Sequence, residues 1–97
     1  MSEKYQKRIE IIANRSIQED LFEAFEKREI VKHYTLVPVA FGVGRQGPRM
    51  GDHIWPEENF VLTVYCSEEE AQKIRETVNE IKNFFVQEGI KLFEISL

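Results

Sequence analysis

The chain has 97 residues, of which 42% are hydrophobic, enough for one domain with a modest core. Its formal net charge is −4, with 17 acidic and 13 basic residues, so it lacks the basic surface that general nucleic-acid binding requires. The single cysteine, Cys66, excludes an internal disulfide, and the absence of a signal-peptide core or of roughly 20 consecutive apolar residues predicts a cytoplasmic protein.

The sequence pattern of the first half of the chain predicts a strand, a helix and a second strand. Residues 5–14 place isoleucines at strand spacing. Ser16 with Glu19 forms a capping box, and apolar residues at helical spacing extend the predicted helix to about residue 28. Residues 31–41 are rich in β-branched and aromatic types, which predicts a second strand with an edge or a bulge at Pro38.

The second half repeats this order. Residues 60–66 are apolar on both faces of a strand, so both faces are expected to be covered. Ser67 with Glu70 forms a second capping box, and the helical spacing that follows predicts a helix to about Gln87, with Gly89 as its C-cap. The last residues of the chain predict a fourth strand.

This order of elements predicts a ferredoxin-like βαββαβ fold, as a single domain over residues 1–97. In such a fold a four-stranded antiparallel sheet carries both helices on one face, and here a long loop over about residues 42–58 joins the second and third strands. The other face includes Val61, Thr63 and Tyr65 and is too apolar to remain in water. We expect it to be buried between subunits.

The loop over residues 42–58 is far longer than the about 2–5 residues usual for a hairpin, which indicates a functional segment. It opens with GVGRQG, Gly42 to Gly47, which resembles the G-x-G-R-Q signature at the base of the T-loop in the nitrogen-regulatory PII signalling family. The resemblance implies a trimer that binds an adenine nucleotide or another small anion in clefts between subunits. It also implies a loop that docks onto a membrane transporter or an enzyme.

Candidate effector-binding residues lie at the base of this loop. Gly42 and Gly44 let the backbone approach a ligand closely, and Arg45 offers a charge for a phosphate or carboxylate. By resemblance, Gln46 stands where the family ligates a metal–ligand complex, and Arg49 is the second arginine of the loop. The sequence shows no recognisable catalytic arrangement, which predicts a binding protein and not an enzyme.

Three departures from the PII pattern bear on the ligand. The loop has no tyrosine for nucleotidylylation, and only Gln87, Glu88 and Gly89 stand where the family has a phosphate loop with glycine and lysine. No basic segment like the family's tail precedes Leu97. These departures predict a short, divergent PII-like protein that is not uridylylated and does not hold ATP through the usual segments.

The second half of the loop supports an alternative function. Asp52 and His53 are adjacent, and an imidazole beside a carboxylate suits zinc, copper or nickel. On this alternative the chain is a trimeric metal-binding protein that resembles the CutA-type ion-tolerance proteins in layout. A solvated histidine among surface acids fits the same residues, so both interpretations stay open. His33 and Cys66 are interpreted as structural residues.

Overall fold

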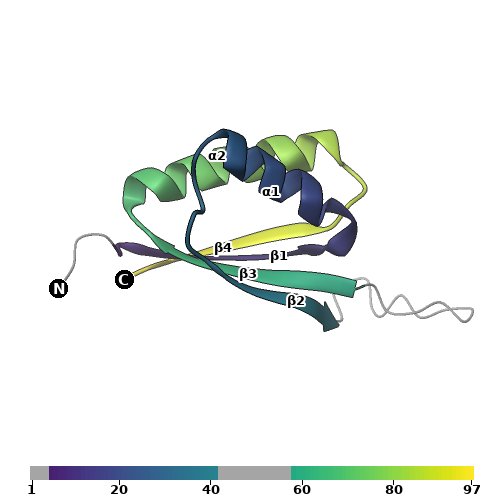
Figure 1. Ribbon diagram of the computed structural model, residues 1–97, viewed down its shortest axis with the longest axis horizontal. Coiled ribbons are helices and arrows are strands. Elements are labelled where there is room, and N and C mark those ends of the chain that lie inside the picture. The colour runs from purple at the N-terminus through teal and green to yellow at the C-terminus, as the bar shows by residue number, and fades with distance from the viewer. Residues whose placement is uncertain (1–4, 42–57) are drawn as a thin grey trace, which may run out of the picture.

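The computed structural model describes residues 5–41 and 58–97 (Figure 1). In chain order the elements are β1 (Lys7–Asn14), the 3-10 helix η1 (Arg15–Ile17), α1 (Gln18–Lys27), β2 (Thr35–Phe41), β3 (Glu58–Cys66), α2 (Glu68–Phe84) and β4 (Ile90–Ser96). No helix within the described ranges has both the length and the apolar character needed to cross a membrane.

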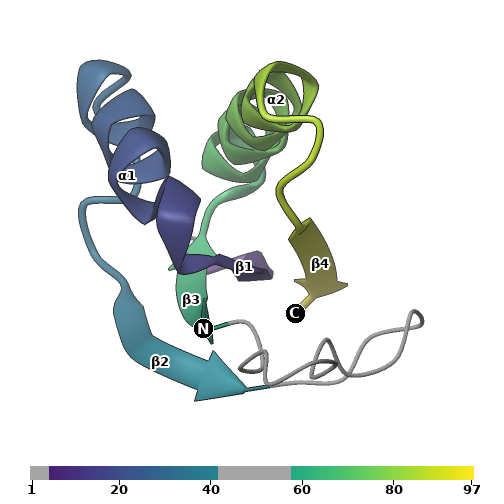
Figure 2. The same cartoon turned by 90° about the vertical axis from the view of Figure 1, so that its right-hand side faces the viewer.

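The four strands form one antiparallel sheet in the order β2-β3-β1-β4. β1 pairs with β3 on one side and with β4 on the other, so β2 and β4 are the edges. Both helices pack on the same face of the sheet, as the view along the strands shows (Figure 2). This arrangement confirms the predicted ferredoxin-like βαββαβ fold.

The core lies between the helices and the covered face of the sheet. Every second residue of β1 and β3 points to that face because side chains alternate along a strand. Leu21 and Phe25 from α1 and Ile74 from α2 complete the core, each at most 1% exposed. The apolar row predicted for the third strand is confirmed as buried and consists of Phe60, Leu62, Val64 and Cys66.

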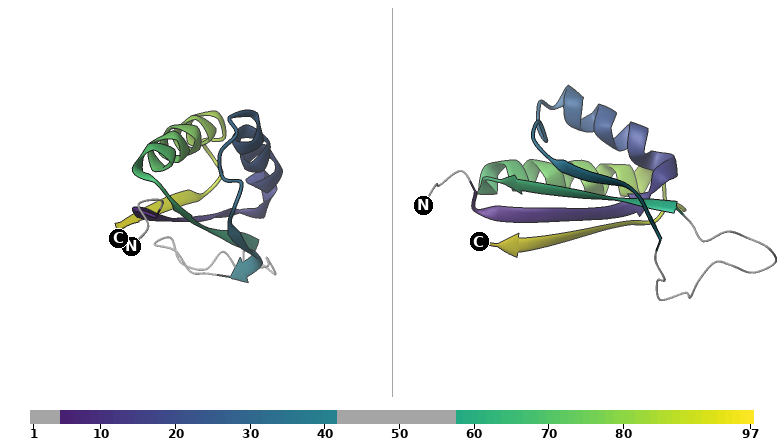
Figure 3. Two further views of the ribbon diagram at one scale, coloured as in Figure 1. Left: turned by 60° about the vertical axis from the view of Figure 1, so that its left-hand side comes forward. Right: turned by 60° about the horizontal axis from the view of Figure 1, so that its bottom comes forward.

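Within the described chain, no helix or strand covers the opposite face of the sheet (Figure 3). The register places Arg8, Glu10 and Ile12 of β1 on this face, since they alternate with the buried residues. Large apolar side chains of the flanking strands lie beside them and are about half exposed: Val37, Tyr65, Phe93 and Ile95. We call this surface the open face.

The start of the first helix differs from the prediction. The capping side chain is that of Asn14, whose Oδ1 accepts a hydrogen bond from the Ser16 backbone N–H at 2.9 Å. The predicted capping box of Ser16 and Glu19 is therefore wrong, because the short Asn14 amide reaches this donor first and opens η1 before α1 begins. Ser67 caps α2 as predicted, and its Oγ accepts from the Glu70 N–H at 3.1 Å.

The Glu70 carboxylate does not complete that capping box. It accepts a hydrogen bond from the Val31 backbone N–H at 2.8 Å. Val31 has a φ of 57°, in the left-handed region that β-branched residues rarely adopt, at a cost on the order of 1–3 kcal/mol. The hydrogen bond and the burial of the Val31 side chain hold this conformation. Because the chain bends here, β2 begins at Thr35 and not at residue 31, which leaves His33 in the linker.

The end of α2 also differs from the prediction. The helix stops at Phe84 and not near Gln87, and its C-cap is Phe85 and not Gly89. The Phe85 N–H donates to the Ile81 carbonyl at 2.8 Å, and its half-buried ring packs against the core, which turns the chain out of the helix. A Cβ at Gly89 would meet nothing within 4 Å, so packing does not require glycine there.

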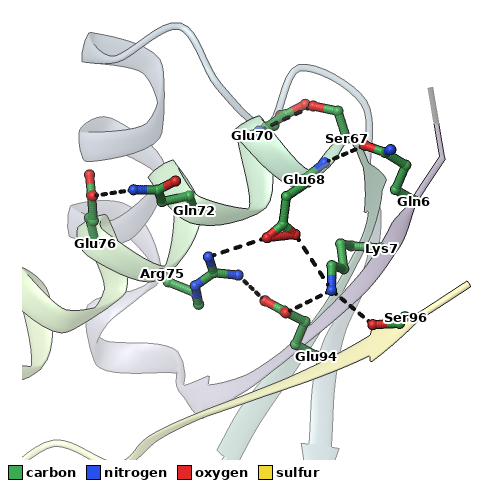
Figure 4. A network of polar contacts seen from close by, with 10 residues as sticks. All are labelled: Gln6, Lys7, Ser67, Glu68, Glu70, Gln72, Arg75, Glu76, Glu94 and Ser96. Carbon is green, nitrogen blue, oxygen red and sulfur yellow. Dashed lines mark hydrogen bonds and ion pairs between the residues drawn. The ribbon is translucent and has the colours of Figure 1, made fainter. Parts of the chain in front are cut away.

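A polar network joins the first turns of α2 to β1 and β4 (Figure 4). Lys7 Nζ lies 2.8 Å from Ser96 Oγ, 3.4 Å from Glu94 Oε2 and 3.5 Å from Glu68 Oε2, and Arg75 pairs with both of these glutamates. Burial acts to raise the pKa of Glu94, but hydrogen bonds from Arg75 and Lys7 outweigh it and hold that pKa below its usual value. The Glu94 carboxylate therefore stays charged at neutral pH.

Burial also governs the chemistry of Cys66. Desolvation raises the pKa of its thiol from 9.0 to about 11, and the nearby carboxylates of Glu70 and Glu94 act in the same direction. The thiol is therefore protonated at neutral pH and behaves as a small hydrophobe, as predicted.

The two helix starts can be compared by removing their polar side chains. Ser67→Ala should lower the free energy of unfolding by about 1 kcal/mol, because it removes an observed N-cap hydrogen bond. Ser16→Ala is the matched control and should change it by less than about 0.5 kcal/mol, since the Ser16 hydroxyl caps nothing. Urea unfolding followed by circular dichroism measures both. Equal losses would show that the Ser16 hydroxyl does cap the first helix.

The thiol gives the fold a pH dependence of known sign. Because the folded pKa is raised, the contribution of the protonated thiol is fully present below about pH 9 and is lost as pH rises toward about 11. The free energy of unfolding of the wild type should therefore fall more steeply over this range than that of Cys66→Ala, which lacks the thiol. Parallel pH curves for the two proteins would contradict the assignment.

Candidate functional site

The segment that the sequence singles out leaves β2 at Phe41 and enters β3 at Glu58, and these two residues pair across the strands. Glu58 therefore belongs to β3 and not to the loop. The effector and metal candidates lie outside the described residues: Gly42, Gly44, Arg45, Gln46, Arg49, Asp52 and His53. The structure does describe the strand ends that carry this segment, the last residues of β2 up to Phe41 and the first residues of β3 from Glu58, here called the loop root.

A bulge in β2 sets the direction in which the strand reaches the loop root. Val37 pairs with Val61 and Ala40 pairs with Asn59, so β2 holds one more residue than β3 between these pairs. Pro38 lies in this interval, as predicted, where its missing N–H breaks no ladder hydrogen bond. The bulge bends the strand, and Figure 2 shows the resulting turn in β2.

An ion pair ties the loop root to the end of β1. The guanidinium of Arg15, in η1, pairs with the carboxylate of Glu58, the first residue of β3. Both side chains are about half exposed, so the pair contributes only about 0–1 kcal/mol to stability. Its consequence is local: η1 and the start of β3 are held together, and the Arg15 charge is already engaged by a carboxylate.

The turn between α2 and β4 reaches the same end of the sheet. The Asn14 N–H donates to the Gly89 carbonyl at 3.1 Å, and within the turn the Glu88 N–H donates to the Phe85 carbonyl at 3.0 Å. Figure 1 shows the turn, η1 and the loop root together at one end of the molecule. Three segments that are distant in sequence therefore converge at the end of the sheet where Phe41 and Glu58 lie.

Sequence reasoning identified the loop but missed the residues that frame it. Asn14, Arg15 and Glu58 carry no motif, and only their strand register brings them together. The capping propensity of Asn14 was the one available signal. The turn residues Gln87 to Gly89 were singled out as the place of the missing phosphate loop, and the structure puts this turn at the loop end of the sheet.

A hollow of about 520 Å³ lies at the other end of the sheet, between the α1–β2 linker and the start of α2. Its lining includes Tyr5, His33, Tyr65, Cys66 and Lys73. The protonated Cys66 thiol is neither a nucleophile nor a thiolate ligand at neutral pH.

In the ranges 5–41 and 58–97, no group of three or more His, Cys, Asp or Glu side chains is placed to hold a metal ion.

Solved structures similar to this chain share its fold. TTHA0516 from Thermus thermophilus, described as a PII-like signalling protein, is 28% identical, with 95% of this chain and 86% of that chain covered and a TM-score of 0.66. CPII from Thiomonas intermedia, a nitrogen regulatory PII-like protein bound to ADP, AMP and bicarbonate, is 19% identical, with coverages of 95% and 87% and a TM-score of 0.62. A DUF3240 family protein from Shewanella baltica is 12% identical, with coverages of 100% and 92% and a TM-score of 0.71.

The family assignment comes from the sequence of the whole described fold and not from the loop motif alone. No curated protein matches the chain. The family model described as "Nitrogen regulatory protein P-II", in contrast, matches residues 6–95, from the start of β1 to the end of β4. The resemblance noted at Gly42 to Gln46 is thereby extended over nearly the full length, and the chain belongs to the P-II family.

Proposed function

We propose that this protein is a non-enzymatic sensor that binds a small anionic effector at the base of the 42–58 loop and signals through the loop to a membrane transporter or an enzyme. The observation that carries the proposal is the P-II family match over residues 6–95, combined with the G-x-G-R-Q residues at the start of the loop. The frame supports it, because η1, the loop root and the α2–β4 turn converge at the same end.

The effector class follows from the charges available at this end. The Arg15 guanidinium is engaged by Glu58, and the turn of Gln87, Glu88 and Gly89 brings a carboxylate in place of a lysine. Contacts to an anion therefore fall on the loop arginines, Arg45 and Arg49, and on backbone amides freed by the glycines. An adenine nucleotide or bicarbonate fits this chemistry, and CPII has been crystallised with ADP, AMP and bicarbonate.

The proposed assembly is a homotrimer with the effector clefts between subunits. The open face supports assembly, since Val37, Tyr65, Phe93 and Ile95 are about half exposed on it. An apolar surface of this kind on a small chain marks an interaction site. The metal-binding alternative has no comparable support, because Asp52 and His53 lie outside the described residues and the family match favours the PII-type role.

Arg45→Ala tests the proposed site. ADP, AMP, ATP and bicarbonate are each titrated against the wild type in a thermal-shift assay. At a free concentration of about 100 times its Kd, an effector that binds only the folded protein adds roughly 2.7 kcal/mol of stability, which raises the melting temperature by roughly 10–20 °C. Arg45→Ala should lose this response, while its melting temperature without ligand stays nearly unchanged. Arg28→Ala, on an exposed pair with Glu80, is the matched control and should keep the response.

Tryptophan fluorescence supplies an independent readout. Trp55, in the 42–58 segment, is the only tryptophan of the chain, so its emission reports on this segment alone. We expect the true effector to shift the emission to the blue and to reduce quenching by iodide in the wild type, but not in Arg45→Ala. A wild type that responds to none of the four anions, or an Arg45→Ala variant that responds fully, would contradict the proposed site.

A further inference from the structure

The centre of the open face carries one cation and one anion. Arg8 and Glu10 lie on the central strand β1, and Arg8 Nη2 is 3.3 Å from Glu10 Oε2. Their side chains are 34% and 30% exposed, respectively. Most of their neighbours are apolar. Tyr65 and Ile95 stand opposite Arg8 in the register, and Phe93 stands opposite Glu10 on one side, with Thr63 on the other.

This ion pair is incompletely satisfied within one chain. A guanidinium has five N–H donors, and among the described residues Arg8 donates one hydrogen bond, to the Glu10 carboxylate. Arg8 Nε is buried and has no partner among the described residues. Water serves the outward-facing donors while the face is open. Any surface that covers the face must bring acceptors, because a guanidinium buried against apolar groups alone is strongly destabilising.

A second copy of this chain meets that requirement. Its open face brings the same apolar side chains and one carboxylate for each guanidinium, so the charge pattern is complementary to itself. In a cyclic assembly each copy donates at one interface and accepts at the other, which leaves neither Arg8 nor Glu10 unpaired. A purely apolar partner would bring no acceptor for Arg8.

We propose that Arg8 of one copy pairs with Glu10 of the next, so that these ion pairs close a ring inside the homotrimer. This inference rests on the trimer of the proposed function and assigns the residues that specify it. Buried ion pairs are better suited to setting which surfaces align than to adding stability. The ring therefore fixes the relative positions of the sheets, and with them the loop roots at the ends of the sheets.

Charge reversal separates this ring from a pair that acts only within one chain. In a ring made only of R8E or only of E10R, residue 8 of each copy faces a like charge on residue 10 of the next. Each variant alone should therefore raise the dissociation constant of the assembly by at least about 30-fold. An equimolar mixture of the two variants should recover part of the assembly, because two of the three contacts between copies are attractive in every mixed ring, whereas all three are repulsive in a ring of either variant alone. Analytical ultracentrifugation and native mass spectrometry of differently tagged chains measure both effects.

The controls use an ion pair that faces solvent. Glu23 and Lys27 on α1 form an exposed pair at 3.6 Å, and E23K and K27E should leave assembly unchanged. The neutral variants R8M and E10Q avoid like-charge contacts within the strand. Each should fold, as judged by circular dichroism, and should still weaken assembly by about tenfold or more.

The outcomes distinguish this inference from the proposed function. A wild-type monomer at micromolar concentration would overturn the trimer and the ring together. A wild-type trimer that R8E, E10R and the neutral variants leave intact would overturn the ring and leave the trimer standing. Dissociation by R8E and E10R without recovery in their mixture would also overturn it, since the pair would then act within a single chain.

Discussion

Two helices cover only one face of a four-stranded sheet, and most features of this molecule follow from that limit. The chain places Leu21, Phe25 and Ile74 over one face and leaves Tyr65, Phe93 and Ile95 about half exposed on the other. Burying a large apolar side chain contributes roughly 1.5–3 kcal/mol, so the open face is a strong driving force for association. One face of the sheet is thus left uncovered by its own chain, and in the proposed trimer further copies would cover it.

The same topology places η1, the loop root and the α2–β4 turn at one end of the sheet. β1 lies between β3 and β4, so its C-terminal residues meet the start of β3 on one side and the α2–β4 turn on the other. Arg15 reaches Glu58, and Asn14 reaches Gly89. The residues on either side of the 42–57 segment, Phe41 and Glu58, therefore belong to paired strands and not to another loop. Sites that are held by regular elements keep their geometry better than sites held by loops alone.

The fold was readable from the sequence because its strongest signals are periodic. Alternation in residues 60–66 and helical spacing after Ser67 survive in the structure, since each reports a face that packs on the core. The order of elements then leaves few topologies, and the ferredoxin-like one is confirmed.

The errors occur where a local motif competes with a distant partner. Ser16 and Glu19 have the spacing of a capping box, but Asn14 caps the helix start, and its backbone N–H is held by the distant Gly89 carbonyl. Glu70 satisfies the spacing of the second box, yet its carboxylate binds Val31, 39 positions away in sequence. No local pattern contains that information. The effector residues at 42–49 rest on the family resemblance and remain predictions, since they lie outside the described residues.

Placing the effector between copies has a thermodynamic consequence. A ligand that binds only the assembled form stabilises the assembly, and by reciprocity a stronger assembly tightens the binding of the ligand. If the copies associated only weakly, the binding free energy of the effector would be used to bring them together. The number of copies in the assembly would then depend on whether the effector is bound. The proposed ring of Arg8 and Glu10 pairs would complete the assembly before the effector binds. The differential affinity of the effector would then act on the segment between Phe41 and Glu58, which would make the loop, and not the number of copies, the reporter of occupancy.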